Sequence, residues 1–388
     1  MTNAEKALKL SIILPCLNEE SAIGDCLESI HSVISKNHID AEIIVVDNGS
    51  TDNSVKIIES KQHLFKHFSL FIEKKRGYGA AYMRGLKEAR GEYIFMADAD
   101  NTYDFGQIPE FLKKLEAGAD LVVGNRFSGV MEKKSMPWLH RNIGNPFLSL
   151  LVKTFFKVKI GDIHCGARAI SKKAYEKINL NTQGMEFASE MIIKAAKAKL
   201  VIAEIPVSYK KRTGESKLRS FRDGWRHLRF ILLYSPLVLF LIPGALLFIG
   251  GCIGIIVFYY STPSFLNITF YIHPMFLFSG CIIAGYQLVY FAFFARIYAI
   301  THMGERDPIF EKLFRYVTIE KASILGLVLL AISLLIYLSI FLQWVHSGLS
   351  PLNEIKNSIV ALTLLVVGIE TISSAFMLSI IGIQEKQL

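Results

Sequence analysis

The feature that most constrains this chain is a long stretch without a charged side chain. Between Phe230 and Ala295 the sequence contains no Asp, Glu, Lys or Arg. A buried helix or strand of a globular domain is much shorter than this, whereas a helix of about 20 apolar residues crosses the hydrocarbon core of a membrane. The stretch therefore predicts two membrane spans joined by a short loop, which we place at residues 231–259 and 275–299.

Two more apolar segments, residues 322–345 and 358–383, are long enough to span a membrane. Residues 231–388 thus predict an all-α transmembrane domain of four helices. This part holds 7 basic and 7 acidic residues, so the whole formal net charge of +9 belongs to the part before it. Such segregation excludes a single soluble globular domain, and the high apolar content excludes a disordered chain.

The cysteines are too few for a disulfide scaffold, and no CxxC pair or Cys/His zinc spacing occurs. We expect them to be reduced or buried thiols. They are Cys16, Cys26, Cys165, Cys252 and Cys281.

The basic residues around the spans predict an orientation. The loop between the second and third spans is basic, whereas Lys356 is the only Lys or Arg in the other two loops. Positively charged loops stay on the cytoplasmic side, so we expect the middle loop, the N-terminal part and the C-terminus there. Residues 1–8 do not resemble a signal peptide, so we expect the charged N-terminal part to stay in the cytoplasm, at a bacterial or archaeal plasma membrane or at the endoplasmic reticulum. The basic residues of the middle loop are Arg296, Arg306, Lys312, Arg315 and Lys321.

Two features inside the predicted spans stand out. Gly250 and Gly254 have the spacing of a helix-packing face. Glu370 lies near the middle of the fourth span, where it is either paired or protonated inside the bundle, or in contact with a lipid head group or another subunit.

The charged part alternates short β-branched runs with helical patterns. Strands at residues 10–14 and 42–46 flank a helix at residues 21–35, which makes a βαβ unit. We therefore expect an α/β domain with a mostly parallel sheet, in which ligands bind at the carboxyl ends of the strands. The pattern continues with a helix at 54–61, a strand at 69–72, a helix at 79–89 and a strand at 93–97.

Polar turns follow three of these strands, at residues 15–20, 47–52 and 98–100. Asp98 and Asp100 concentrate negative charge directly after a buried strand, which favours a bound Mg²⁺ or Mn²⁺ that bridges phosphate oxygens. A basic, glycine-containing segment at residues 74–81 leads into a helix N-terminus, where backbone N–H groups accept phosphate. The dinucleotide-binding fingerprint and the P-loop pattern are both missing from the sequence.

Together these motifs resemble the family 2 glycosyltransferases, whose catalytic domain has the GT-A fold. Within that family the chain resembles the polyprenyl-phosphate hexose synthases, the group of dolichol-phosphate mannose and glucose synthases. The resemblance covers residues 10–229 and rests on an ordered set of motifs: PCLNEE, VVDNGSTD, RGYGAAYMRG, ADAD, VVGNRF, HCGARA and RTGESKLRS.

The resemblance implies roles for particular residues. Asp98 and Asp100 match the DxD motif that holds the divalent metal and the donor diphosphate, and with Arg126 they are the expected catalytic residues. The expected nucleotide-sugar site also includes Pro15, Asn18, Glu19, Asp47, Gly77, Arg212 and Lys217. The expected acceptor-phosphate site contains Arg126, Arg141, Arg168 and Ser216, and Ser216 also lies with Arg212 and Lys217 in the loop that closes over donor phosphates.

Two departures from the family pattern bear on specificity. Asn48 stands where the family often has a second carboxylate, so this position need not be charged. Asn101 follows the DxD motif where mannose-type enzymes commonly have Leu-Gln, which resembles the glucose-type subgroup. We therefore expect UDP-glucose as the first donor and GDP-mannose as the second.

Four further polar residues have a structural explanation, either alone or beside an equally good functional one. We expect His164 and Cys165 to pack within a loop. Glu186 and Glu190, at i,i+4 on a helix, either face the sugar or form an exposed acidic first turn.

Two segments predict contact with the membrane surface. Residues 217–230 place Leu218, Phe221, Trp225 and Leu228 at helical spacing with arginines between them, which is typical of an interfacial amphipathic helix between a catalytic domain at 1–216 and the spans. Residues 138–156 are helical and too polar to span. The two segments either form a membrane-facing helix pair that receives the lipid phosphate, or belong to the core.

The predicted activity is inverting, metal-dependent transfer of one hexose from a nucleotide sugar to a polyprenyl or dolichyl phosphate at the cytoplasmic face. A lipid phosphate is already ionised near pH 7, so it needs cationic groups rather than a general base. We expect no nucleic-acid partner, and an oligomer is compatible with the sequence. The alternatives are a processive polysaccharide synthase, whose QxxRW motif is missing from the sequence, and a non-catalytic membrane scaffold or transporter subunit.

Overall fold

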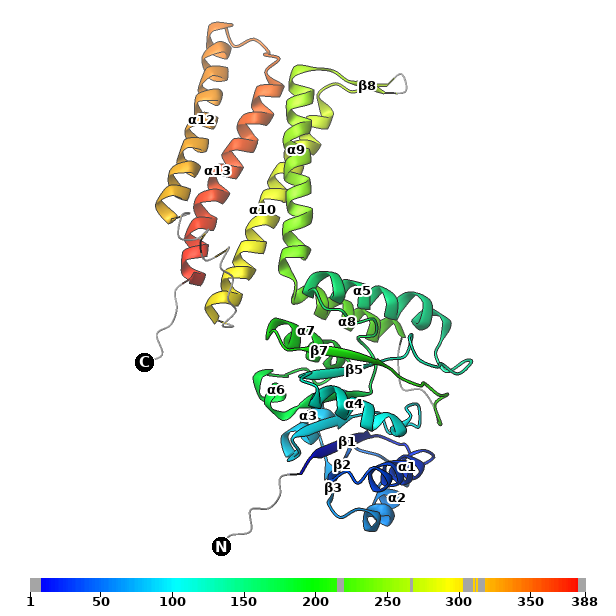
Figure 1. Cartoon of the computed structure of the whole chain (residues 1–388). Coiled ribbons are helices and arrows are strands. Elements are labelled where there is room, and N and C mark those ends of the chain that lie inside the picture. Colours follow the sequence, from blue (N-terminus) through cyan, green and yellow to red (C-terminus); the bar gives the residue numbers. More distant parts are fainter. Residues whose placement is uncertain are drawn as a thin grey trace. The chain divides into compact units, whose positions relative to one another are not determined.

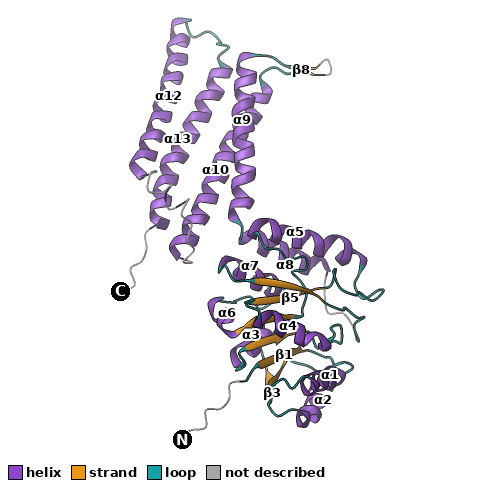
Figure 2. Cartoon of the chain, viewed as in Figure 1, coloured by secondary structure: helices purple, strands orange, loops and turns teal. Residues whose placement is uncertain are grey.

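The computed structural model describes residues 8–214, 220–265, 268–302, 310, 312 and 318–382. The chain divides into two compact units, with the boundary between Tyr234 and Ser235. The first unit contains an α/β sheet and the second consists of long helices (Figure 1, Figure 2). Each unit is described by itself below.

The first unit is built on a seven-stranded sheet with the order β3-β2-β1-β4-β6-β5-β7. Strand β6 runs antiparallel to β4 and β5, and the other neighbouring pairs are parallel. The expected α/β domain with a mostly parallel sheet is therefore confirmed. The strands are β1 (Leu10–Cys16), β2 (Ala41–Asp47), β3 (Phe68–Ile72), β4 (Tyr93–Met96), β5 (Leu121–Asn125), β6 (Arg168–Ser171) and β7 (Ile202–Pro206).

Apolar periodicity explains how the helices cover this sheet. In α4 the residues Ile108, Phe111, Leu112 and Leu115 are buried, and their i, i+3, i+4, i+7 spacing forms one face. The sheet and the helices around it enclose one continuous apolar core. The helices are α1 (Ile23–Lys36), α2 (Ser54–Lys61), α3 (Tyr78–Glu88), α4 (Ile108–Glu116), α5 (Asn145–Phe156), α6 (Lys172–Lys177), α7 (Phe187–Lys197) and α8 (Ser220–Leu233), with short 3₁₀ turns η1 (Gln62–Leu64) and η2 (Phe105–Gln107).

The helical segment that includes residues 138–156 is not one regular helix. A π-type turn, η3 (His140–Gly144), precedes α5, and the N–H group of Asn145 donates to the carbonyl oxygen of His140. Pro146 follows directly, and because it has no N–H group it cannot donate the α-helical hydrogen bond to the residue four positions earlier. Proline is well placed at the start of a helix, so α5 begins here.

The second unit contains four helices that are long and apolar enough to cross a membrane. The expected all-α domain of four helices is confirmed. Helices that follow one another in the chain are antiparallel: α9 packs on α10, and α12 on α13 (Figure 1). Helix α10 also packs on α13, and these two run parallel. The helices are α9 (Ile242–Tyr260), which follows a π-type turn η4 (Leu237–Leu241), α10 (His273–His302), α12 (Ile319–His346) and α13 (Ile355–Gly382); a two-stranded ribbon, β8 (Ser264–Phe265) and β9 (Ile268–Thr269), follows α9.

Glycines allow the helices of this unit to approach closely. A Cβ atom at Gly254 would lie 2.2 Å from the ring of Phe278 on α10, and one at Gly251 would lie 2.8 Å from the α10 backbone. At Gly250 no atom of the described residues lies within 4 Å of the corresponding position. The prediction of a Gly250/Gly254 packing face is therefore wrong for Gly250, because Gly251 shares the packed side of α9 with Gly254.

Glu370 lies on α13 beside a cluster of hydroxyl groups. The hydroxyl of Tyr286 is 2.8 Å from that of Thr371 and 3.3 Å from that of Tyr290. The Oε2 atom of Glu370 is buried without a hydrogen-bond partner in the described part of the chain. Which of the roles expected for Glu370 applies stays a prediction.

Candidate active site

The turns after β1 and β2 are joined by hydrogen bonds at one edge of the sheet. Ser50 Oγ accepts from the N–H group of Asn18 at 2.9 Å, and Asn18 Oδ1 accepts from the N–H group of Thr51 at 2.7 Å. Asp47 is buried and accepts from the N–H groups of Gly49 and Ser50. Asx-type bonding of this kind sets the turn, and it holds the first two polar segments together.

Asn48 explains why an amide suits this position. Its Nδ2 donates to the carbonyl oxygens of Glu73 at 3.0 Å and Lys75 at 2.9 Å, and its Oδ1 accepts from the N–H group of Gly77 at 2.8 Å. An ionised carboxylate has no donor for the two carbonyls. Asn48 therefore fastens the basic segment after β3 to the turn after β2.

The glycines at the start of α3 are required by close packing. Gly77 has φ of +152°, and a Cβ atom there would lie 2.1 Å from the carbonyl oxygen of Gln183. At Gly79 a Cβ atom would lie 2.3 Å from the carbonyl oxygen of Thr182. The segment before α7 thus packs directly on the N-terminus of α3, and phosphate binding is not the only reason for glycine here.

Glu190 and Glu186 separate into different roles. Glu190 is fully buried and accepts from the N–H groups of Asn181 and Thr182 at 2.9 Å, from the Thr182 hydroxyl at 2.6 Å, and from Lys194 at 2.7 Å. It organises the segment that packs on α3, so neither expected role, facing the sugar or lying in an exposed first turn, describes it. Glu186 has a buried Oε2 atom without a partner among the described residues.

Asp98 lies at the end of β4 among aromatic residues. Its Oδ1 accepts from the hydroxyls of Tyr78 at 3.0 Å and Tyr82 at 3.2 Å, and the Tyr82 ring stacks on Phe187. Burial, together with the neighbouring charge of Asp100, raises the pKa of Asp98 to about 6. The two carboxylates therefore form a site that a cation would stabilise.

Arg212 joins this carboxylate pair to the first turn. Its Nη1 atom is 3.3 Å from Asp100 Oδ2, and its Nη2 atom donates to Glu19 Oε1. Asp100 also accepts from the N–H group of Thr102 at 3.2 Å and from its hydroxyl at 2.5 Å. The structure thus brings together Glu19, Asp98, Asp100 and Arg212, which the sequence places far apart.

The donor set at this site fits a metal that shares its ligands with a substrate. Within the described ranges, no group of three or more His, Cys, Asp or Glu side chains is arranged to hold a metal by itself. Asp98 and Asp100 offer two hard carboxylates, and Mg²⁺ is commonly bound by one or two carboxylates with water and substrate phosphates. The residues present therefore fit a Mg²⁺ or Mn²⁺ ion held jointly with a diphosphate.

Arg126 is held by a carboxylate that the sequence did not single out. Its Nε and Nη2 atoms donate to Asp162 at 2.7 and 2.9 Å, and both side chains are buried. The guanidinium lies 5.2 Å from the ring centroid of Tyr209. This paired geometry fixes the position of Arg126 and compensates its charge, and contact with an acceptor phosphate stays a prediction.

The remaining predicted acceptor-site residues differ in exposure. Arg168 is 3% exposed and donates to the carbonyl oxygens of Cys165, Ala188 and Ile163, so in this structure it holds a loop against α7. Arg141 lies in η3 and is exposed. Ser216 and Lys217 lie outside the described residues.

The His164 to Cys165 segment packs as expected within its loop. The His164 ring meets that of His227 on α8 edge to face, with centroids 4.4 Å apart. Cys165 is buried, and burial raises the pKa of its thiol to about 12. All five cysteines are free thiols, and the three in this unit are buried.

Two family models and several known proteins match this chain. A model of glycosyl transferase family 2 matches residues 11–179, and a model of the glycosyltransferase family 2 C-terminal transmembrane region matches residues 293–382. The chain is 34% identical over 382 residues to the low-salt glycan biosynthesis hexosyltransferase Agl6 of Haloferax volcanii, covering 98% of this chain and 91% of that protein. This chain belongs to glycosyl transferase family 2.

This family 2 glycosyltransferase has other relatives. It is 30% identical over 207 residues to an uncharacterized glycosyltransferase of Mycobacterium tuberculosis, covering 53% of this chain and 87% of that protein. A crystal structure of glucosyl-3-phosphoglycerate synthase from Mycobacterium tuberculosis with Mn²⁺ and UDP matches with a TM-score of 0.48 and 19% identity, covering 59% of this chain and 80% of that one.

The chain is therefore an enzyme that transfers a sugar, with a GT-A catalytic domain and a membrane region. Several residues of its site escaped sequence reasoning. Tyr78 and Tyr82 bind Asp98, and Asp162 binds Arg126. The two tyrosines lie four residues apart in a glycine-containing segment, and this spacing only weakly indicates a functional role. The sequence contained no indication for Asp162, because its partner Arg126 lies 36 residues away.

Proposed function

We propose that this glycosyltransferase moves a single hexose from a nucleotide sugar to a polyprenyl phosphate with inversion at the anomeric carbon. UDP-glucose is the donor that we favour, and GDP-mannose is the second. The observation that carries the proposal is the Asp98/Asp100 pair, joined through Arg212 to Glu19 on the turn after β1. The relative from Haloferax volcanii, whose name describes a hexosyltransferase of glycan biosynthesis, supports a hexose.

The donor would bind where the three turns meet. A divalent cation at Asp98 and Asp100 would stabilise the charge that develops on the leaving diphosphate. Arg212 already lies 3.3 Å from Asp100, so the same guanidinium is placed to bind a diphosphate oxygen when a cation takes over the carboxylates. The turn around Asn18 and Asp47 would hold the nucleoside.

The acceptor argument rests on the charge of a lipid phosphate. Such a phosphate is an ionised nucleophile near pH 7, so the chain needs no carboxylate to remove a proton. This agrees with Glu190, whose oxygens are occupied by backbone N–H groups and Lys194. Arg141, which is exposed in η3, and Arg126 would bring the phosphate to the sugar.

The acceptor would arrive along α5 and α8, which pack against each other. The side chains of Trp138 before η3, Ile143 on η3 and Leu150 on α5 are exposed, and on α8 Trp225 is exposed. Exposed apolar residues in such number mark a contact surface. We infer that this pair of helices lies at the cytoplasmic surface of the membrane, while the four long apolar helices of the second unit cross it.

The test uses membranes that contain the full chain, labelled nucleotide sugars and polyprenyl phosphate, with and without EDTA. We expect a mild-acid-labile glycolipid from one donor, no product with EDTA, and loss of product by about 100-fold or more in Asp98→Ala and Asp100→Ala. Asp104→Asn is the matched control, because Asp104 caps η2 by accepting from Gly106 and stands outside the carboxylate pair.

Three results would contradict parts of this proposal. Full activity in the double alanine variant would refute the metal assignment. Label in long polymer would favour a processive synthase instead. Absence of transfer from every donor, with nucleotide sugar still bound, would favour a non-catalytic scaffold.

A further inference from the structure

An apolar groove lies at one end of the membrane unit. It has a volume of about 660 Å³ and is formed by the end of α10, the start of α12 and the end of α13. Its walls are mainly hydrocarbon and aromatic, with small residues between the larger ones. They include Tyr290, Phe293, Ile297, Ala322, Leu378 and Ser379.

The order of the helices shows which end this is. Because successive helices are antiparallel, α10 ends, α12 begins and α13 ends where α9 begins (Figure 1). The chain therefore enters the bundle, at the start of α9, at the end where the groove lies. Arg296 on α10 and Lys321 on α12 also lie at this end, which makes it the basic end of the bundle.

We propose that this groove binds the isoprenoid chain of the acceptor lipid, which rests on the proposed function above. Of the described residues that line it, Glu320 alone carries a charge. Its carboxylate is fully exposed at the rim and would repel a phosphate. The groove thus suits a neutral hydrocarbon chain whose phosphate stays outside, rather than a phospholipid held by its head group.

The expected energy of this binding is modest. The chain is already in hydrocarbon before it enters, so the hydrophobic effect contributes little, and close packing must supply the preference. Filling the groove should therefore weaken binding of a long isoprenoid phosphate by about tenfold, and should not affect an acceptor too short to reach it.

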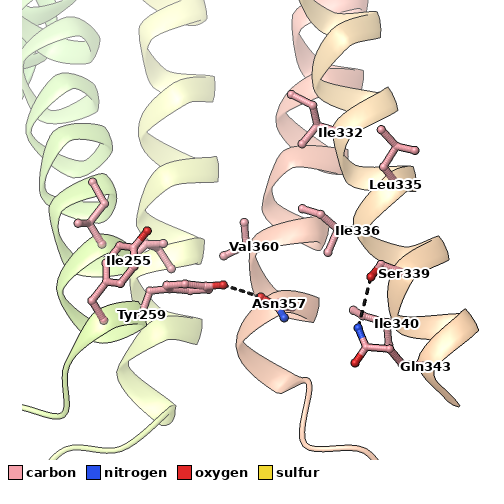
Figure 3. A pocket seen from close by; sticks show the side chains of 12 residues that line it. Ile255, Tyr259, Ile332, Leu335, Ile336, Ser339, Ile340, Gln343, Asn357 and Val360 are labelled. Carbon is pink, nitrogen blue, oxygen red and sulfur yellow. Dashed lines mark hydrogen bonds between the residues drawn. The ribbon is translucent and has the colours of Figure 1, made fainter. Parts of the chain in front are cut away.

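A second groove provides the control (Figure 3). It lies between α9, α12 and α13 at the opposite end of the bundle, and its volume is about 580 Å³. Figure 3 shows Ser339 and Val360 on its wall, with the Tyr259 hydroxyl donating to Asn357 Oδ1 at 2.8 Å. It is similar in size and lies away from the basic end.

The experiment compares Ser379→Phe, which fills the first groove, with Ser339→Phe, which fills the second. Binding of a radiolabelled long-chain polyprenyl phosphate and of a phosphate with two isoprene units is measured on the purified full chain in detergent. We expect Ser379→Phe to raise the Kd of the long lipid about tenfold and to leave the short one unchanged. Ser339→Phe should change neither. Ala322→Phe, from α12, should reproduce the effect of Ser379→Phe.

The outcomes separate this inference from the proposed function, because binding is measured without sugar transfer. Long-lipid binding that falls only in the Ser379 and Ala322 variants supports the groove even where no sugar moves. Equal binding of long and short lipids by the unchanged protein overturns it, and so does unchanged affinity in both variants. Equal displacement of the label by a phospholipid would show that ordinary acyl chains occupy the groove, which also overturns it.

Discussion

Asp98 shows how one carboxylate can be prepared for a cation by its surroundings. Two tyrosine hydroxyls donate to its Oδ1 atom, and a Cβ atom on Gly166 would lie 2.4 Å from its Oδ2 atom. The side chain is therefore fixed by close neighbours rather than free to turn away from Asp100. The charges of Asp98 and Asp100 repel each other, and a bound cation would relieve this repulsion.

This arrangement predicts a pH dependence of metal binding. Since burial and Asp100 raise the pKa of Asp98 to about 6, the carboxyl group becomes protonated as the pH falls below that value. A protonated carboxyl group is a poor ligand, so Mn²⁺ affinity should fall by about tenfold for each pH unit below 6 and level off above it. Electron paramagnetic resonance of free Mn²⁺ between pH 5 and 7.5 measures this. Asp98→Asn should bind more weakly and with a flat profile, and a flat profile in the unchanged protein would contradict the prediction.

Glu190 and Glu186 provide a second prediction at this scale. Glu190→Ala leaves the N–H groups of Asn181 and Thr182 and the ammonium of Lys194 without their acceptor, which should cost about 3–5 kcal/mol of stability. Thermal unfolding of the full chain in detergent should show a clear fall in Tm. Glu186→Ala is the matched control, since the buried Oε2 atom of Glu186 has no hydrogen-bond partner in the described part of the chain, and an equal fall in both variants would refute the distinction.

Among the helices, α5 and α8 are the two for which we predict contact with the membrane surface, and their buried and exposed sides differ. Each helix buries one side, with Leu148 and Val152 on α5 and His227 and Ile231 on α8. The exposed sides combine apolar with cationic residues, Leu150 with Lys153 on α5 and Trp225 with Arg229 on α8, which core packing alone does not explain. Burial shows core packing for one side of each helix, and membrane contact of the opposite side stays a prediction.

Tryptophan fluorescence tests the exposed faces. The chain contains three tryptophans, of which Trp138 is 69% exposed and Trp225 is 60% exposed. In a Trp344→Phe variant only these two remain, and brominated lipids in nanodiscs should quench them strongly if the helices lie at the membrane surface. A variant that retains only Trp344, on α12, is the reference for quenching within the bundle. Quenching near zero in Trp344→Phe would contradict the proposed contact.

At the scale of the whole molecule, the distribution of basic residues predicts the orientation. Ser350, in the exposed loop after α12, should face away from the cytoplasm, and Glu59, exposed on α2, should face the cytoplasm. An impermeant maleimide should label Ser350→Cys in intact cells and Glu59→Cys only after lysis. The native thiols are buried or half-buried, so their background should be low. The reverse labelling pattern would contradict the orientation.

The two-part organisation, the mostly parallel sheet, the four apolar helices and the family could all be predicted from the sequence. These properties follow from local patterns: a charge-free stretch, strand and helix periodicity, and short motifs such as Asp98-x-Asp100, each of which is complete within a few neighbouring residues. Parallel strands also bring their carboxyl ends to one edge, so the convergence of three turns was predictable.

The contacts of the individual polar side chains could not be predicted in this way and became clear from the folded structure. Asn48 spans two loops, Asp162 pairs with Arg126 across 36 residues, and Glu190 serves the backbone rather than a substrate. The groove between α10, α12 and α13 likewise belongs to no single segment. The physical reason is that these hydrogen bonds and this cavity depend on distances between residues far apart in the chain. Composition and periodicity do not determine those distances.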